Sequence, residues 1–218
     1  NGVNIASLNE AVRLAGVQRI SDAMRFAGDI GVKTVIVHPS GRPGPNEASY
    51  HLEMIGAATE RAYRSVSELV KVAEETGIRI ALENLSHVGL PCRPVESMQE
   101  LRAFIADFPH DLVGLCLDVG HARLSGYDPA EQARLGSERL WGLHLQDVDG
   151  KKDCHWVPGR GVIDWASLGQ ALSDIEFDGA WTLEVLTAHS DSSPEQLAEE
   201  CAFLSRRWAK SGMLGFSV

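Results

Sequence analysis

Short apolar, β-rich runs alternate with longer helical patterns along the chain, and this alternation limits its possible folds more than any other feature. Five runs are strand-like: VKTVIV (32–37), IRIALE (78–83), LVGLCLD (112–118), LWGLHLQ (140–146) and AWTLEV (180–185). Their composition is typical of strands buried on both faces of a sheet. The alternation predicts parallel strands joined by right-handed crossovers, either in an open doubly wound sheet or in a barrel.

The predicted helices cover residues 8–31, 58–77, 94–108, 128–136, 164–177 and 193–212. Asp164 and Ser193 are predicted to cap helix starts, Pro129 to occupy a first turn and Gly77 to end a helix. No glycine-rich GxGxxG turn follows the first strand, which weakens a dinucleotide-binding interpretation. A barrel is favoured, because barrel active sites gather where the strands end and polar residues stand at those positions here.

Composition sets broad limits on the class of protein. With 218 residues, 44% of them apolar, the chain can bury one sizeable core, and we expect residues 1–218 to form a single domain. No apolar run is long enough to span a membrane. The net charge of −10 argues against broad nucleic-acid binding. Four widely spaced cysteines fit reduced thiols in a cytoplasmic protein, and a homo-oligomer is left open.

A side chain able to bind a metal stands at the end of every predicted strand. These residues are His38, Glu83, Asp118, His144 and Glu184. Strand side chains alternate between faces, and counting back by twos from the last four gives small residues, whereas the other register is bulky. We therefore predict that all five point to the same crowded inner side of the sheet.

The chemistry of this set indicates a cation. Two glutamates, an aspartate and a histidine that converge would resist burial as bare charges. Taken singly, each could be a core histidine or a paired structural carboxylate. Together, Glu83, Asp118, His144 and Glu184 predict one divalent metal site, and their oxygen and imidazole donors suit Mn²⁺, Mg²⁺, Co²⁺ or Zn²⁺.

The loops after the strands hold a second group of candidates. His121 follows Asp118 by three residues; the structural alternative is that Asp118 caps a turn and His121 sits on its surface. Asp153 and His155 lie in a long loop, where they could bind the substrate or a second ion, or simply be solvated. Two glycines flank Arg160 and could let the backbone approach a ligand.

The motifs VIVHPSG, ALEN, LCLDVGH, LHLQD, DCHWVPGRGVIDW and FDGAWTLEV together resemble the sugar phosphate isomerase/epimerase family of the xylose isomerase-like TIM barrel superfamily, which is related to endonuclease IV. The resemblance implies a (β/α)8 TIM barrel. It also implies that the four predicted ligands hold one metal and that His121 contacts the substrate. We further expect His38, Asp153, His155 and Arg160 to bind substrate. A complete barrel has eight βα units, and the five present match the last five, so we expect the first three strands to be absent from this chain.

The leading functional hypothesis is a divalent-metal-dependent isomerase or epimerase of a sugar, sugar phosphate or related polyol. The metal would polarise the carbonyl of the substrate. Glu83 and Glu184 would act as general base and acid and exchange a proton through an enediolate.

Two other function classes are weighed against it. An endonuclease IV-like phosphodiesterase acting on abasic DNA would use His38, His121, Asp153 and His155 to hold a second or third zinc ion. Against it, the loops are short and lack the basic and aromatic residues expected for gripping DNA. A catalytically inactive barrel that serves as a binding module is opposed by the fact that no predicted metal ligand is replaced.

Overall fold

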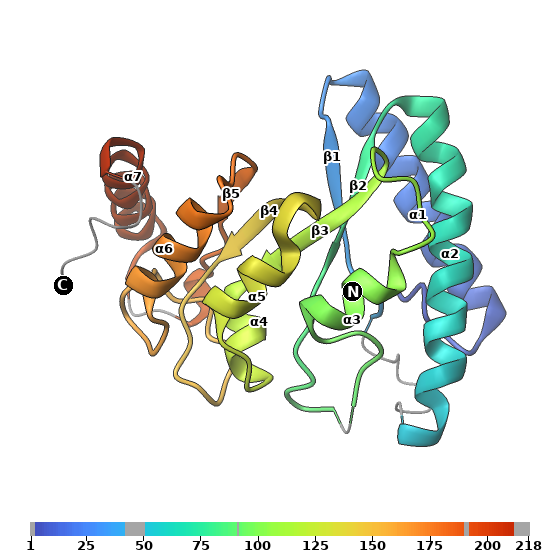
Figure 1. Cartoon of the computed structure of the whole chain (residues 1–218), viewed down its shortest axis with the longest axis horizontal. Coiled ribbons are helices and arrows are strands. Elements are labelled where there is room, and N and C mark those ends of the chain that lie inside the picture. Colours follow the sequence, from blue (N-terminus) through green and yellow to red (C-terminus); the bar gives the residue numbers. More distant parts are fainter. Residues whose placement is uncertain (1–2, 42–50, 91, 190–191, 212–218) are drawn as a thin grey trace. The chain divides into compact units, whose positions relative to one another are not determined.

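The computed structural model of the chain describes residues 3–41, 51–90, 92–189 and 192–211. It forms two compact units, Asn1–Cys116 and Leu117–Val218. Strand β3 (Val113–Asp118) begins in the first unit and ends in the second. Each unit has its own helices and paired strands (Figure 1).

The first unit contains helices and strands in alternation. Its elements are α1 (Glu10–Asp29), β1 (Thr34–Val37), the 3-10 turn η1 (Leu52–Met54), α2 (Ile55–Thr76), β2 (Arg79–Glu83), α3 (Met98–Phe104) and the start of β3. β1 pairs with β2 and β2 with β3, both in parallel, and Glu83 lies opposite Cys116. Helices α1 and α2 lie against each other (Figure 1). The predicted strand–helix alternation is confirmed in this unit.

Local signals fix the helix ends of the first unit. Gly77 ends α2 in the left-handed conformation at a φ of 68°, as its sequence position predicts. Helix α3 is shorter than the predicted 94–108, and that prediction was wrong at both ends. Val95 has a φ of 62°, which a helix cannot contain, and Ser97 with Glu100 forms a capping box that starts α3 at Met98.

The second unit continues the alternation. After β3 come α4 (Val119–Leu124), α5 (Pro129–Gly136), η2 (Ser137–Arg139), β4 (Leu140–Leu145), α6 (Trp165–Asp174), β5 (Ala180–Leu183), η3 (Thr187–His189) and α7 (Pro194–Ser211). β4 and β5 pair in parallel, with His144 opposite Thr182. The predicted cap Asp164 accepts a hydrogen bond from the Ser167 backbone N–H, and Pro129 opens α5 behind the cap Asp128. Within the described ranges, no helix is both long enough and apolar enough to cross a membrane.

Strand β5 departs from the prediction that every strand is buried on both faces. Its first three residues are exposed, and the Trp181 side chain is 38% exposed. Strand β4 covers one edge of β5, and no other strand of the described residues pairs with the opposite edge. The apolar composition of AWTLEV therefore predicted more burial than β5 has among these residues.

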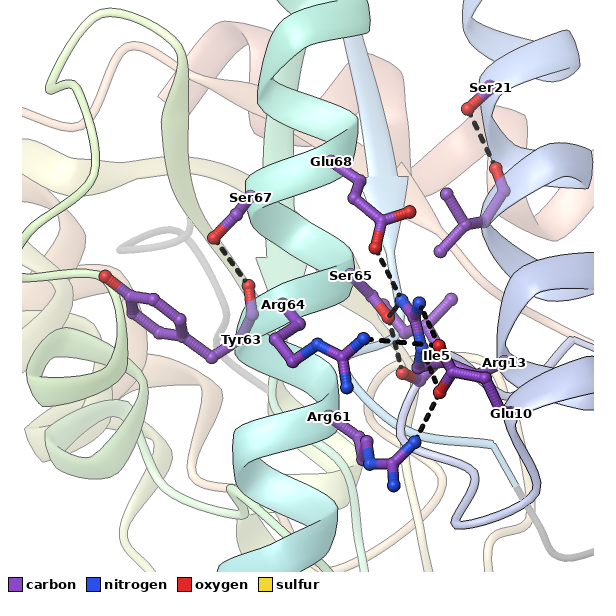
Figure 2. A network of polar contacts seen from close by, with 11 residues as sticks. Ile5, Glu10, Arg13, Ser21, Arg61, Tyr63, Arg64, Ser65, Ser67 and Glu68 are labelled. Carbon is purple, nitrogen blue, oxygen red and sulfur yellow. Dashed lines mark hydrogen bonds and ion pairs between the residues drawn. The ribbon is translucent and has the colours of Figure 1, made fainter.

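A buried arginine joins α1 to α2 in the first unit (Figure 2). The Arg13 guanidinium is 1% exposed and donates to Glu10 at 2.7 and 3.0 Å. It also donates to the Ser65 hydroxyl and to Glu68, both at 2.9 Å, and the Ser65 hydroxyl donates to the Ile5 carbonyl at 2.8 Å. A buried charge needs such compensation, because an unpaired one would be strongly destabilising.

Glu10 is the carboxylate on which three arginines of this network converge. Besides its contact with Arg13, it forms ion pairs with Arg61 and, at 3.2 Å, with Arg64 (Figure 2). The hydrogen bonds from Arg13, helped by the charges of Arg64 and Arg61, lower the pKa of Glu10 from 4.5 to about 2. The carboxylate therefore stabilises the fold above pH 4.5, and this stabilisation is lost as the pH falls through about 2.

We predict that Glu10→Gln lowers the free energy of unfolding at pH 7, because Arg13 loses its closest anion. The difference from the wild type should shrink as the pH is lowered from 4.5 towards 2. Urea unfolding followed by circular dichroism at several pH values measures this. Glu74→Gln, at an exposed position of α2, is the matched control and should have little effect at any pH. A Glu10→Gln difference that is constant across the pH range would contradict the prediction.

Candidate metal centre

Three of the four predicted metal ligands come together within the second unit. Asp118 ends β3, His144 lies in β4 and Glu184 directly follows β5. Each offers a ligand atom, and these atoms lie within 4.8 Å of one another. His144 Nδ1 is 3.0 Å from Glu184 Oε2, and Asp118 is fully buried. The carboxyl ends of parallel strands thus deliver two carboxylates and an imidazole to one place, a donor set that fits a hard or borderline divalent cation.

The fourth predicted ligand, Glu83, belongs to the first unit. It is the last residue of β2 and is 1% exposed. His38, which directly follows β1, places its Nε2 3.1 Å from Glu83 Oε2, and its own side chain is more than half exposed. His38 and Glu83, two of the five predicted strand-end residues, are therefore in contact.

Asp118 and His121 are joined in a way that combines both interpretations of LCLDVGH. Asp118 caps α4, because its Oδ1 accepts the His121 backbone N–H at 2.7 Å. The His121 ring, however, is only 11% exposed and lies between two carboxylates, with Nδ1 3.5 Å from Asp118 Oδ2 and Nε2 3.4 Å from Asp153 Oδ2. Helix α4 itself was not predicted, although an aspartate three residues before this histidine is a capping spacing.

Asp153 lies between two imidazoles and is not a solvated loop residue. Its Oδ2 is 3.4 Å from His155 Nε2, the same distance as from His121 Nε2. Burial raises the pKa of Asp153, but hydrogen bonds from His121 and His155 outweigh burial and hold it well below its usual range. Burial lowers the pKa of His155, whereas Asp153 and the Glu184 carbonyl raise it to about 9. At neutral pH the loop therefore presents a fixed anion beside a cationic imidazole.

Arg160 lies elsewhere in the second unit. Its Nη2 donates to both carboxylate oxygens of Glu200 on α7, at 2.7 and 2.8 Å. The structure thus joins the guanidinium to α7, and substrate contact by Arg160 stays a prediction.

Two residues that the sequence analysis passed over organise this loop. Asp147 is fully buried and accepts hydrogen bonds from the backbone N–H of Gly159 at 2.8 Å and from Trp165 Nε1 at 2.9 Å. A Cβ on Gly161 would lie 2.3 Å from Asp147 Oδ1, so the loop backbone passes directly over the carboxylate. Gln146, also fully buried, contacts Asp118 and Asp153. The available signal was a pair of polar residues at the end of a buried strand, in LHLQD.

Comparisons of the sequence with a family model and with known proteins point to the same family. The family model of the xylose isomerase-like TIM barrel matches residues 1–207. An uncharacterized protein of Methanocaldococcus jannaschii, MJ1311, is 31% identical over 186 residues, which are 84% of this chain and 60% of the relative. The D-psicose 3-epimerase of Enterocloster bolteae is 32% identical over 124 residues, 57% of this chain and 39% of that enzyme. The chain thus spans less than two thirds of the length of either relative.

A solved structure agrees with this family. The crystal structure of a D-tagatose 3-epimerase-like protein superposes with a TM-score of 0.73 at 27% identity, covering 94% of this chain and 75% of that one. The predicted fold class, a TIM barrel, is confirmed, as is the resemblance from which it was drawn.

We predict that Asp118→Asn abolishes tight Mn²⁺ binding while leaving α4 capped, because asparagine is as good an N-cap as aspartate. Loss of a group that merely supports a ligand costs about 10–100-fold in metal affinity, so loss of the ligand should cost at least about 100-fold. Calorimetric titration with Mn²⁺ measures this. Asp128→Asn, the same change at the cap of α5, should bind Mn²⁺ like the wild type. Equal affinity in the two variants would reduce Asp118 to a capping residue.

Proposed function

The chain belongs to the xylose isomerase-like TIM barrel family, and on this premise we propose that it acts as a divalent-metal-dependent isomerase or epimerase of a sugar, sugar phosphate or related polyol. The observation that carries the proposal is the convergence of Asp118, His144 and Glu184 at the ends of their strands. Relatives named as D-psicose 3-epimerase and L-ribulose-5-phosphate 3-epimerase support the substrate class.

Glu83 completes the ligand set in this proposal. Its register supports this role, because Glu83 pairs with Cys116, and Asp118 follows Cys116 by two residues on the same strand. Side chains two apart on a strand share a face, so Asp118 shares a face of β3 with Cys116, the residue that pairs with Glu83. Glu83 is buried and already pairs with His38, and a cation would add to the compensation of its charge.

The donor set supports a metal-assisted proton transfer. Held by Glu83, Asp118, His144 and Glu184, a Mn²⁺, Mg²⁺, Co²⁺ or Zn²⁺ ion would polarise the substrate carbonyl and acidify the neighbouring C–H bond. Glu83 and Glu184 are the general base and acid: one carboxylate removes the proton and the other returns it, through an enediolate. The 3.0 Å pair with His144 keeps the Glu184 carboxylate in position for this transfer.

Polar side chains around the ligands would orient the substrate. His121, Asp153 and His155 form one hydrogen-bonding group in the second unit, with a negative carboxylate between two imidazoles. Such a group suits a polyhydroxylated substrate, whose hydroxyls both donate and accept. His38, which contacts Glu83, and Arg160 are assigned the same role.

An endonuclease IV-like phosphodiesterase is the second candidate, and one observation favours it. Asp153 Oδ2 is 3.4 Å from both His121 Nε2 and His155 Nε2, a set of donors that could hold a further zinc ion. The net charge of −10 opposes it, since DNA binding requires neutralised phosphates. Counting bound metal by mass spectrometry separates the two: one ion per chain supports the isomerase, and two or three zinc ions support the phosphodiesterase.

We predict that Glu184→Gln abolishes exchange of the substrate C–H with solvent while keeping weakened metal binding. The amide oxygen can still coordinate a cation, but the side chain can no longer carry a proton. Deuterium incorporation from heavy water into D-psicose, D-tagatose and ketose phosphates measures the exchange. Glu199→Gln, at an exposed position of α7, is the matched control and should exchange at the wild-type rate.

Two results would count against this assignment at different levels. Wild-type exchange rates in Glu184→Gln would move the proton-transfer role to another residue. Absence of exchange by the wild type with every ketose and ketose phosphate would overturn the isomerase proposal itself.

A further inference from the structure

The Gln146 side chain lies between the predicted metal ligand Asp118 and the loop that carries Asp153 and His155. It directly follows β4, and it is fully buried. All of these residues belong to the second unit. A buried amide must satisfy its donors and its acceptor, so the partners of Gln146 are structurally determined.

The amide nitrogen joins two carboxylates. Gln146 Nε2 is 3.0 Å from Asp118 Oδ2 and 3.3 Å from Asp118 Oδ1, and it is 3.1 Å from Asp153 Oδ1. A primary amide has two N–H bonds, so one nitrogen can donate to both residues. Two anions that would repel each other thereby share one neutral donor.

The amide oxygen holds the loop backbone. Gln146 Oε1 accepts the His155 backbone N–H at 3.0 Å. His155 has a φ of 49°, a left-handed conformation that few non-glycine residues adopt. The neighbouring contacts keep it there, because the Leu186 N–H donates to the His155 carbonyl at 3.1 Å, and the His155 ring contacts the Glu184 carbonyl at 2.9 Å.

Close packing fixes the orientation of the amide. A Cβ added to Gly120 would lie 2.7 Å from Gln146 Cδ and 3.0 Å from Nε2, distances at which something must move. The amide of Gln146, and not the backbone of α4, thus favours glycine at position 120, since Gly120 is helical and is not among the glycines with positive φ.

We propose that Gln146 is a positioning residue that couples cation binding at Asp118 to the order of the loop between Asp147 and Ile163. A cation that fixes the Asp118 carboxylate would fix the amide, and the amide in turn holds Asp153 and the backbone of His155. This coupling rests on the metal site of the proposed function. Coupling is reciprocal, so loosening the loop must also weaken cation binding.

Trypsin provides a readout of loop order that is independent of catalysis. Lys151 and Lys152 are exposed in this loop, and cleavage after them can be mapped by mass spectrometry with and without Mn²⁺. In the wild type, saturating Mn²⁺ should slow this cleavage by at least about fivefold, the lower end of ordinary coupling between sites. Mn²⁺ affinity is measured in parallel by calorimetric titration.

The variant Gln146→Met keeps the side-chain length and removes both amide functions. We expect it to be cleaved faster without metal, to lose most of the Mn²⁺ protection and to bind Mn²⁺ about 10–100-fold more weakly. Gln132→Met is the matched control, because Gln132 is also a buried glutamine of the second unit but lies on α5. It should keep wild-type cleavage, protection and affinity.

A second variant moves the amide without deleting it. Gly120→Ala keeps every polar group but forces Gln146 away, and alanine is compatible with α4. It should weaken Mn²⁺ binding and loop protection in the same direction as Gln146→Met. Circular dichroism establishes that each variant is folded before it is compared.

The outcomes separate the coupling from the proposed function. If the wild type binds Mn²⁺ and the variants Gln146→Met and Gln132→Met do not differ in Mn²⁺ affinity or loop cleavage, the coupling alone is overturned. Unchanged binding and protection in Gly120→Ala would also overturn the coupling alone. Failure of the wild type to bind Mn²⁺ at all would overturn the metal site and the coupling together.

Discussion

The cost of burying carboxylates close together is the constraint on which the second unit depends. Asp118 and Asp147 are fully buried, and Asp153 and Glu184 lie nearby with limited exposure. Several kinds of group compensate these charges: backbone and indole N–H donors at Asp147, imidazoles at Asp153 and Glu184, and a backbone and an amide donor at Asp118. In this part of the chain, the contacts that compensate the buried charges therefore stabilise the fold and also shape the candidate site.

The first unit also contains a buried charge, but this charge is positive. There the buried charge is the Arg13 guanidinium, and the carboxylates of Glu10 and Glu68 reach it from partly exposed positions (Figure 2). This network lies between two helices and uses the planar donor fork of arginine. It is explained by helix packing, whereas Asp118 and Glu184 at the strand ends contact histidines and, at Asp118, the Gln146 amide. The contrast distinguishes a structural ion network from a candidate site.

Much of this architecture could be predicted because local chemistry determines it. Strand runs, the left-handed Gly77, the cap Asp164 and the first-turn Pro129 depend on neighbouring residues only, and the strand ends follow from alternation. The convergence of Asp118, His144 and Glu184 was predictable because parallel strands end on one side. The exposure of β5 was not, since burial depends on what lies beside a strand. Gln146 was missed because an amide becomes informative only when its partners are known.

The hydrogen bonds between the Asp147 carboxylate and the loop that ends at Ile163 limit how this site can change. A Cβ on Gly161 would lie 2.2 Å from the Val148 carbonyl oxygen. The Gly159 backbone N–H donates to Asp147. The backbone N–H groups of Val148 and Ile163, at the two ends of the loop, also donate to Asp147, at 3.0 and 3.2 Å. An inserted or deleted residue near either end would break these contacts. A change in what this site binds should then come from exchanging side chains around Asp153 and His155 at constant loop length. Insertions would be tolerated only towards the exposed tip near Lys151.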